Sequence, residues 1–559
     1  MNKYFIILVV LITALGSCSG SGQGTAVKPS VARVQHSMPE MPLLPVIDTS
    51  IVIMPIQKTV YLDPTNGSDN NNGTGMSQAV KTFQKAVSLC NYGMPGINGG
   101  HYYNLITIAG GTHFLEGDNY FFQSYDLAGE NGSEIDGLYK KKTIDGSFVY
   151  KNISLIGESS PSPCVLDGTN LTGLNPGMGV ITLSGSNVFI KNITIQNSLT
   201  SRGIDVRPVR LYTRNSAIRI HDILISNVQV KNVGWFGINL DAVDKAVVEF
   251  TTVTKSCMMN EGEKRYSGYP SALKCRFSTH ISYINNTIYN NWGEGLNFNK
   301  SIHCYGRGNA AYDNYAVNFY LDNAQDVVLA GNLLYNNGDD RTFWKTINSK
   351  STLKKAATNI SIANEKYEET LDSKRIFIFN NICLKGPFAF GYCDRVSGSN
   401  DFSDIYVLNN TFIDLAADEG AEMSLVNFIK PVIPGTYHNI QISNNIFTMP
   451  VHKLTQRVEL ARTSNNDTLL STAGITTTNN YWSAKPYKHG RYNFVKQADE
   501  KVNPALPTDV TDLATLNNIK PAKNSNLVYA QPHSNFIITD FFGVNRVASP
   551  GSNVGAVEK

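Results

Sequence analysis

The sequence has little charge, and neither sign dominates. Charged residues make up 17% of the chain, and 48 basic residues face 45 acidic ones, for a formal net charge of +3. A nucleic-acid-binding protein usually carries a strong excess of basic residues on one surface. The composition therefore gives no electrostatic case for a nucleic acid as partner.

Long apolar runs are also missing. Residues 5–15 are apolar, but this run is too short to cross a bilayer, which takes about 20 residues. With Lys3 before it, the run is typical of a secretion signal, and Leu15-Gly16-Ser17-Cys18 resembles a bacterial lipoprotein box. We expect a signal peptide at residues 1–18, a lipid on Cys18 and a place in the cell envelope. Ordinary cleavage and secretion is the alternative, because Ser is a weaker choice than Gly or Ala before the cysteine.

The cysteines lack the paired spacing of zinc sites, and no metal site is expected from them. Cys275 falls on the inward parity of an expected strand, where a cysteine acts as a small hydrophobe. A disulfide between loops stays open, since the sequence cannot pair the cysteines. The glycine-rich, Asp-containing nonapeptide of Ca²⁺-binding repeats is absent as well.

What the sequence does contain is a recurring short phrase, in which alternating apolar residues precede Asn or Asn-Asn. It appears as ISNVQV, INNTIYNN, AGNLLYNN, FNNICL, LNNTFI and SNNIFT between residues 225 and 448. The same spacing of twenty-three residues separates Asn286 from Asn309 and Asn309 from Asn332. A fixed period of this length, made of strands without helical pattern between them, is typical of a β-solenoid.

The recurring asparagines have a structural explanation. Coils of a β-solenoid stack at roughly 4.8 Å, so a residue that recurs once per coil forms a column. Asn tolerates the left-handed region of a tight bend, and its amide can bond the backbone. We therefore expect stacked Asn amides that bond one another along the column.

The expected domain organisation follows from composition and pattern. Residues 19–57 are expected to be a flexible tether, 58–104 an N-terminal segment, 105–450 the β-helix, and 451–559 irregular C-terminal coils and a tail. Val80, Phe83 and Val87 form a helical stripe within residues 78–90, which predicts a helix that caps the open end of the core. Two polar insertions, at residues 258–270 and 339–359, interrupt the coils, and such insertions often lie on a binding face.

Three parts of the chain resemble the bacterial right-handed parallel β-helix family, the pectate-lyase-like superfamily of polysaccharide-processing proteins. They are VYLDPTNGSDNNNGTG with KTFQKAV and GGTHFL, then GEGLNF with NFYLDNAQDVVLAGNLLYNN, and finally DFFGVNR with SNVGAVE. The resemblance implies an all-β right-handed parallel β-helix and a polysaccharide or oligosaccharide substrate. The Asn-Thr-Asp, Asp-Asp and Gly-His-Gly motifs of polygalacturonases are missing, and so is the aspartate cluster of calcium-dependent pectate lyases.

Alignment of the coils by their inward residues predicts two polar columns on one outer face. One column is Asn239, Lys274, Asn297 and Tyr320, and its neighbour is Asp241, Arg276, Asn299 and Asp322. No Ser, Thr or Val interrupts either column, although a solvated sheet face usually contains such residues. Cross-strand pairing of charges is the structural alternative for these positions.

Two further carboxylates and two tryptophans complete the candidate site. Glu294 lies between two glycines, close to Trp292, and Glu365 follows a strand just after the second insertion, which contains Trp344. An aromatic ring near a carboxylate suits a sugar, whose apolar face stacks on rings, but it also suits simple packing of a loop. We expect the substrate to contact both tryptophans and five residues of the polar columns: Asn239, Asn297, Asn299, Asp241 and Tyr320.

Three functions remain open from the sequence. Glycoside hydrolysis needs two carboxyl groups, and Glu294 with Asp322, or Asp322 with Glu365, would supply them from adjacent coils. Elimination from a uronate polymer needs a base and a neutralising cation, for which Lys274 and Arg276 would serve, with Ca²⁺ held by Asp241 and the asparagines as an added cofactor. The third is a monomeric glycan-binding or structural protein without catalysis.

Overall fold

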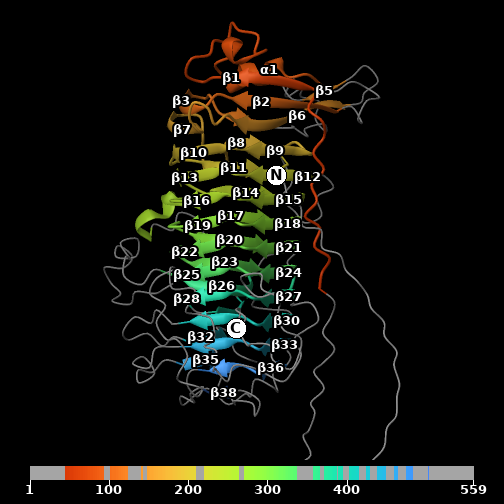
Figure 1. Ribbon diagram of the computed structural model, residues 1–559, viewed down its shortest axis with the longest axis vertical. Coiled ribbons are helices and arrows are strands. Elements are labelled where there is room, and N and C mark those ends of the chain that lie inside the picture. Colours follow the sequence, from red (N-terminus) through yellow and green to blue (C-terminus); the bar gives the residue numbers. More distant parts are fainter. Residues whose placement is uncertain are drawn as a thin grey trace, which may run out of the picture. The chain divides into compact units, whose positions relative to one another are not determined.

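The structure is a computed structural model. It describes residues 44–92, 101–123, 140–142, 148–208, 219–263, 270–336, 357–365, 371–384, 386, 388–393, 402–413, 424–428, 437–448, 459–463, 474–482 and 501–502. Within these residues, nearly all regular structure is β, and the strands form three long sheets, which we name sheets A, B and C (Figure 1). All pairings between strands are parallel except that of β5 with β6.

Sheet A contains β1 (Lys58–Leu62), β2 (His101–Ile108), β5 (Lys140–Lys142), β6 (Phe148–Gly157), β9 (Val188–Lys191), β12 (Ile220–Ser226), β15 (Val243–Glu249), β18 (Thr279–Ile284), β21 (Ile302–Arg307), β24 (Gln325–Ala330), β27 (Lys374–Phe379), β30 (Phe402–Leu408), β33 (Tyr437–Ser443) and β36 (Ile475–Thr478). Sheet B contains β3 (Gly111–Gly117), β7 (Cys164–Leu171), β10 (Ile193–Ser198), β13 (Gln229–Val233), β16 (Thr252–Thr254), β19 (Thr287–Tyr289), β22 (Ala310–Tyr312), β25 (Leu333–Tyr335), β28 (Ile382–Leu384), β31 (Thr411–Ile413), β34 (Ile446–Thr448), β37 (Tyr481–Trp482) and β38 (Lys501–Val502). Sheet C contains β4 (Phe121–Phe122), β8 (Gly179–Leu183), β11 (Arg202–Val206), β14 (Ile238–Asp241), β17 (Ser271–Arg276), β20 (Glu294–Asn299), β23 (Val317–Asp322), β26 (Thr358–Asn364), β29 (Phe388–Cys393), β32 (Ser424–Phe428) and β35 (Glu459–Thr463).

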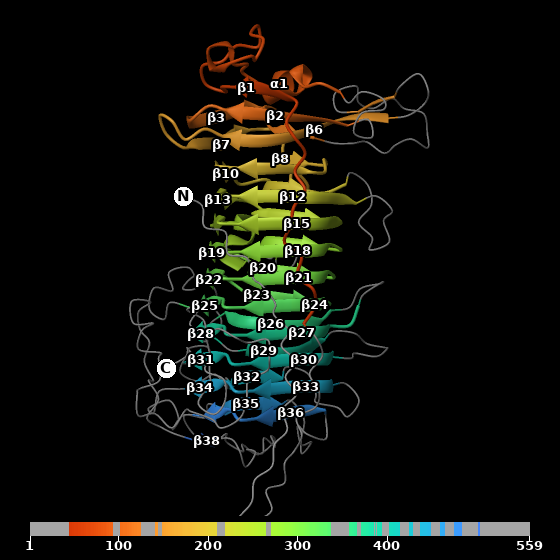
Figure 2. The same cartoon turned by 45° about the vertical axis from the view of Figure 1, so that its right-hand side comes forward.

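Each coil of the chain visits the three sheets in the same order. The coil that starts with β18 in sheet A continues through β19 in sheet B and β20 in sheet C, and the chain returns to sheet A as β21. Figure 2 shows these rungs stacked from the N-terminal to the C-terminal strands. This path confirms the parallel β-helix that the period predicted.

The core is filled by apolar residues that occupy the same place in successive coils. In sheet C, Ile238, Leu273, Leu296, Phe319 and Ile360 are paired in register, and each is fully buried. Because side chains alternate across a strand, this register turns the residues between them to the outer face. The period-two pattern in the sequence therefore determines which residues of sheet C can meet a ligand.

A short helix covers residues at the N-terminal end of the core. Helix α1 (Phe83–Leu89) follows a 3₁₀ turn, η1 (Met76–Gln78), and the Thr82 side chain accepts a hydrogen bond from the backbone N–H of Lys85. Phe83 and Val87 are buried, as the helical stripe predicted, but Val80 lies before the helix and bridges to Leu62 of β1. The capping helix is thus confirmed, over fewer residues than 78–90. Another 3₁₀ helix, η3 (Met258–Glu263), lies in the first insertion.

The asparagine column exists and is buried at the turn between sheets A and B. Its members are Asn286, Asn309, Asn332, Asn381, Asn410, Asn445 and Asn480. The amide of each one donates to the Oδ1 of the next, at 3.0 Å between Asn286 and Asn309 and 2.9 Å between Asn309 and Asn332. The structural interpretation of these asparagines is therefore confirmed.

The residue before each column member takes the left-handed conformation that the bend requires. Asn285, Asn380 and Asn409 have φ between 54° and 56°, and Gly308 and Gly331 fill the same place at 65° and 63°. Asn and Gly are the residues that adopt this region at least cost. The Asn-Asn and Gly-Asn pairs of the repeat thus combine a bend with a hydrogen-bonded column.

Residues 44–57 form neither helix nor strand, but they are bonded to the outside of sheet A. Asp48 pairs with Lys245 at 2.7 Å, and Val52 bonds the side chains of Asp222 and Asn187 through its backbone N–H and C=O. Cys18 and the expected signal peptide lie outside the described residues. In the part of the chain that is described, no helix has the length and apolar character needed to span a membrane.

Candidate functional site

The register of sheet C confirms the two predicted polar columns. Asn239 of β14 pairs with Lys274 of β17, and the pairing continues to Asn297 of β20 and Tyr320 of β23. The neighbouring column contains Asp241, Arg276, Asn299 and Asp322 in the same order. We name this outer surface of sheet C, together with Asp205, Glu294, Lys300 and Glu365, the polar face.

The side chains of the polar face are packed against one another. The two columns include six residues that are only 1–6% exposed: Asn239, Asp241, Asn297, Asn299, Tyr320 and Asp322. Lys274, Arg276 and Glu365 are half-buried and form its accessible part. Because buried charges are costly without partners, the hydrogen bonds and ion pairs of this face determine which groups stay ionised.

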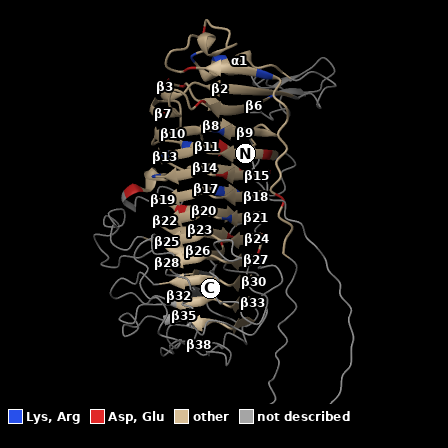
Figure 3. Cartoon of the chain, in the orientation of Figure 1, with Lys and Arg blue, Asp and Glu red and all other residues tan. Residues whose placement is uncertain are grey.

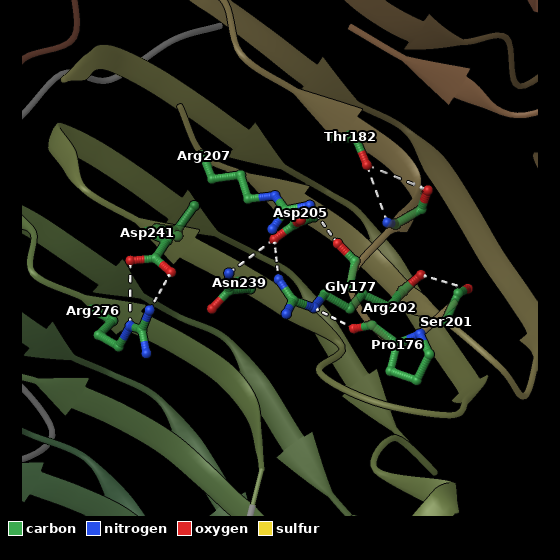
Figure 4. Close-up of polar contacts among 12 residues, drawn as sticks. Pro176, Gly177, Thr182, Ser201, Arg202, Asp205, Arg207, Asn239, Asp241 and Arg276 are labelled. Carbon is green, nitrogen blue, oxygen red and sulfur yellow. Dashed lines mark hydrogen bonds and ion pairs between the residues drawn. The ribbon is translucent and has the colours of Figure 1, made fainter. Parts of the chain in front are cut away.

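Asp205, which contacts two arginines, extends the polar face toward the N-terminal coils (Figure 4). The Asp205 carboxylate accepts hydrogen bonds from Arg202 at 2.7 Å and from the Asn239 amide at 2.8 Å, and it forms an ion pair with Arg207 at 2.7 Å. The two arginines also donate to the backbone carbonyls of Pro176 and Gly177. Three groups therefore fix Asp205, which suits a structural or binding role better than a proton-transfer role.

The next coils carry an ion pair in the second column. Arg276 bonds Asp241 through its Nη2 at 3.1 Å and its Nε at 3.4 Å, as Figure 4 also shows. Burial raises the pKa of the Asp241 carboxyl, although the Arg276 guanidinium opposes that shift. Figure 3 shows basic and acidic residues on the neighbouring strands β11, β14 and β17. This pairing is the cross-strand alternative that the sequence left open for these two residues.

Glu294 lies at the start of β20 in a buried polar environment. Its Oε2 accepts from the Ser271 hydroxyl at 2.6 Å and from the Asn297 amide. Burial raises the pKa of Glu294 to about 7, while the positive charge of Lys274 and these hydrogen bonds hold it down. The Oδ1 of Asn297 has no hydrogen-bond partner among the described residues, so one buried acceptor of the polar face is left unsatisfied.

Asp322 and Glu365 form a carboxyl pair on adjacent coils. Tyr320 and Asp322 of β23 pair with Ser361 and Ala363 of β26, so the second insertion does not separate these strands. Glu365 follows β26 directly, where its backbone N–H donates to Asp322 at 3.4 Å and its carboxylate accepts from the Tyr320 hydroxyl at 2.5 Å. Burial, reinforced by the charge of Glu365, raises the pKa of Asp322 well above its usual range. The raised pKa favours the protonated form of the Asp322 carboxyl relative to an ordinary aspartate.

Two lysines stand close to the carboxyl groups. Among the described residues, no carboxylate oxygen lies within 4 Å of Lys274, whose ammonium lies 5.5 Å from the ring centre of Phe236. Lys300 follows β20, and its backbone N–H donates to the Asp322 carbonyl at 2.7 Å. Burial lowers the pKa of Lys300 to about 8, although the charge of Asp322 opposes the shift. An amine with such a pKa is partly deprotonated near neutral pH and can accept a proton.

The register also places Glu294 relative to Asp322, the other carboxyl pair that the sequence offered. Glu294 begins β20 and pairs with Ser271, whereas Asp322 ends β23 and pairs with Asn299. The two residues therefore lie near opposite ends of neighbouring strands, although the Glu294 carboxylate reaches along its own strand to the Asn297 amide. The charge of Glu294 still contributes to the raised pKa of Asp322. Of the two carboxyl pairs that the sequence offered, the structure brings together Asp322 and Glu365.

The structure describes only one of the two tryptophans predicted to contact the substrate. Trp292 is buried, and its ring lies 5.7 Å from that of Tyr315, so it packs within the coil as the alternative explanation proposed. Trp344 lies outside the described residues. Contact of either ring with a sugar remains a prediction.

Sequence reasoning missed Arg202, Asp205, Arg207 and Lys300. A signal for Asp205 was present, because Ile204-Asp205-Val206 has the alternation of Ile238-Asn239-Leu240, and the two segments pair in register. Lys300 directly follows Asn299, but it lies one residue beyond the strand segment Leu296–Asn299 from which the columns were predicted. Its left-handed φ of 49° turns it back toward the polar face, which alternation alone does not predict.

No group of three or more metal-binding side chains occurs in the described ranges of the chain. The carboxylate of Asp241, which the lyase interpretation assigned to Ca²⁺, is occupied by Arg276. Six cysteines are buried free thiols, namely Cys90, Cys164, Cys257, Cys275, Cys304 and Cys383, and Cys275 points into the core as its parity predicted.

Comparison with known proteins gives likeness of fold only. No protein family model and no curated protein matches the chain. Similar solved structures include the pectate lyase Pel9A, with 12% identity over 91% of this chain and 99% of that chain, at a TM-score of 0.37. An alginate lyase from Paenibacillus sp. str. FPU-7 is 9% identical over 62% of this chain and 98% of its own, at 0.35. The GH136 lacto-N-biosidase from Eubacterium ramulus is 11% identical over 64% of each chain, at 0.37, so the match spans less than two thirds of that enzyme. Similarities at this level of identity and TM-score say nothing about a reaction of this protein. The parallel β-helix fold is established by the strand register of the three sheets in this structure.

Proposed function

We propose that this protein processes polysaccharide and that the polar face hydrolyses glycosidic bonds. The observation that carries the proposal is the carboxyl pair, in which Asp322 has a raised pKa and Glu365 lies on the adjacent coil. Glycoside hydrolysis needs one protonated and one ionised carboxyl group on either side of the scissile bond. The polysaccharide substrate class comes from the resemblance of the sequence to β-helix proteins that process such polymers.

The residues around the pair would divide the work. Asp322 would protonate the leaving oxygen, because burial and the neighbouring charge of Glu365 raise the pKa of its carboxyl. Glu365, half-buried and bonded by Tyr320, would act as the base or the nucleophile. The amide of Asn297, with its unsatisfied Oδ1, would accept a hydrogen bond from a sugar hydroxyl. Lys274 and Arg276 line the accessible part of the face, where a polymer would approach.

The experiment is a screen for turnover on plant and algal polysaccharides, followed by Asp322→Asn and Glu365→Gln on any substrate that is cleaved. Both changes keep size and hydrogen bonding but remove the ionisable proton. Asp404→Asn and Glu249→Gln on sheet A are matched controls, since their carboxylates also accept side-chain hydrogen bonds, from Asn439 and Ser226. Full activity in both polar-face variants would overturn the proposal.

Elimination from a uronate polymer is the second candidate. It is favoured by Lys274, which has no carboxylate within 4 Å among the described residues, and by the lowered pKa of Lys300. Either amine would abstract the proton beside the substrate carboxylate, and Arg276 would steady the resulting charge. Bound Ca²⁺ would assist that role. The unsaturated uronate product absorbs ultraviolet light, which a hydrolysis product does not, so absorbance separates the two reactions.

Export and attachment are proposed from the sequence. We propose that the signal peptide ends before Cys18, that Cys18 is lipidated and that this lipid is the protein's contact with the membrane, with the protein acting as a monomer at the cell envelope. Mass spectrometry of the native protein should find an acylated Cys18 as its first residue. A mature chain that starts elsewhere without lipid would support plain secretion.

A further inference from the structure

A polar groove of about 580 Å³ lies on the outer side of sheet B, away from the residues that make up the polar face. It crosses strands β10, β13, β16 and β19 and the turns that follow them. Figure 1 shows these four strands along one edge of the stack. Its walls consist of amides, two lysines, a threonine and a tyrosine: Gln196, Asn197, Gln229, Lys231, Asn232, Thr254, Lys255, Tyr289 and Asn290. No carboxylate is among them.

The groove is built by the register of sheet B. Gln196 pairs with Lys231, Lys231 with Thr254, and Thr254 with Tyr289, so one residue from each of four coils lines its floor. The residues just before these four are fully buried in the core: Ile195, Val230, Val253 and Ile288. The floor residues therefore point outward in a fixed column, and coil stacking spaces them by about 4.8 Å.

Tyr289 ends a stack of three parallel rings and closes one end of the groove. Its ring centre lies 4.8 Å from that of Tyr312 with planes 9° apart, and Tyr312 stacks on Tyr335 at 4.5 Å. The preceding coil has Thr254 at this place, so no ring covers the other face of Tyr289. That face borders the groove, and a flat aromatic surface of this kind suits the apolar face of a sugar ring.

The polar groups of the groove include several that the protein leaves available. Asn232 donates to Asn197 at 2.7 Å, and Asn197 donates to Asp167 at 2.7 Å, which holds these two amides in place. By contrast, the side chains of Gln229 and Asn290 form no hydrogen bond with another described residue, and Lys231 and Lys255 form no ion pair there. Two lysines without an ion pair among the described residues, on adjacent coils, thus face the same groove, while the Asp167 carboxylate accepts from Gln196 and Asn197 at its edge.

We propose that this groove binds a short stretch of an acidic polysaccharide as a second, non-catalytic site. A sugar ring stacks on the free face of Tyr289, Gln229 and Asn290 bond its hydroxyls, and Lys231 and Lys255 bind its carboxylate or sulfate groups. A neutral glycan would leave both lysine charges without a partner. The groove and the polar face belong to different sheets, so the second site would hold the polymer without entering the reaction.

The test measures binding by calorimetry with tetragalacturonate as the acidic probe and cellotetraose as the neutral one. The parent protein is Glu365→Gln, so that the probe is not consumed. The Lys231→Gln, Lys255→Gln double variant should raise the Kd of the acidic probe about tenfold and reduce its dependence on salt. Tyr289→Ala should weaken binding, whereas Tyr289→Phe keeps the ring and should bind as the parent does.

A matched control is Lys81→Gln with Lys85→Gln, which removes the same charge near helix α1. Unchanged affinity and salt dependence in the groove variants, or equal affinity of the parent for both probes, would overturn the proposal. Failure of the hydrolytic proposal has a different signature, because the Glu365→Gln parent would then release reducing ends as fast as the unaltered protein does. Groove binding and polar-face catalysis are thus tested separately.

Discussion

The asparagine column and the polar face both bury polar side chains, but they satisfy them in different ways. In the column, one residue type recurs in every coil, and each amide bonds the next, as between Asn381 and Asn410. In the polar face, no two adjacent coils present the same pattern, charges outnumber neutral amides at its centre, and the pKa values of Glu294, Asp322 and Lys300 are shifted. Repetition with complete pairing marks a structural device, whereas variety with shifted pKa values marks a candidate for chemistry.

The largest expected effect is on turnover. Asp322→Asn or Glu365→Gln should reduce the rate about 1000-fold, within the range that a general acid or base contributes. Circular dichroism should show that both variants fold. The comparison would fail if Glu249→Gln on sheet A were as inactive as Glu365→Gln.

Substitutions in the asparagine column should lower the stability of the fold rather than the turnover. Asn332→Ala removes the donor to the Gly306 carbonyl and leaves the backbone N–H of Asn309 without its acceptor. We expect a loss of about 3 kcal/mol in the free energy of unfolding, measured with urea, because buried polar groups are left unpaired. Asn70→Ala on the surface should change this free energy by less than about 0.5 kcal/mol. Equal effects of the two substitutions would mean that the column contributes little.

Glu294 should make the stability of the polar face depend on pH. Its pKa in the folded protein, about 7, lies above its ordinary value of 4.5, so the folded state binds the proton more tightly than the unfolded state does. The associated stability is complete below pH 4.5 and is lost as the pH rises to 7, by up to about 3 kcal/mol. Glu294→Gln should flatten this part of the curve of melting temperature against pH, and an unchanged slope would contradict the raised pKa.

The smallest effect distinguishes the two reactions. If the polar face hydrolyses, Lys274→Ala and Lys300→Ala should lower turnover by less than about tenfold, since neither amine exchanges a proton with substrate. If it eliminates, at least one of the two should lower turnover by about 100-fold or more. Kinetics of both variants on the same substrate decides between these outcomes.

Most of the fold could be predicted from the sequence, because the period of the solenoid is local and repeated. Asn286, Asn309 and Asn332 gave the coil length, and alternation around Asn297 and Tyr320 gave the register of the polar columns. The carboxyl pair could be chosen only with the structure, since it depends on which end of a strand each residue occupies. Glu294 and Asp322 lie on neighbouring strands, but Glu294 is the first residue of β20 and Asp322 is the last residue of β23.

Other parts of the site were beyond sequence reasoning for physical reasons. Lys300 joins the polar face through a left-handed bend, and its pKa depends on burial that no linear pattern reveals. Arg202 begins strand β11 and Arg207 directly follows it, and both side chains are held by carbonyls of an earlier coil. These carbonyls lie 26 and 30 residues before the arginines, so the contacts become visible only once the coils are stacked.

The most direct test of the central claim is product analysis on a confirmed polysaccharide substrate, with reducing ends and ultraviolet absorbance followed together. The account predicts that reducing ends accumulate without absorbance and that both signals stay at background in Asp322→Asn. Accumulation of absorbing, unsaturated ends, or full release of reducing ends by Asp322→Asn, would contradict hydrolysis by this carboxyl pair.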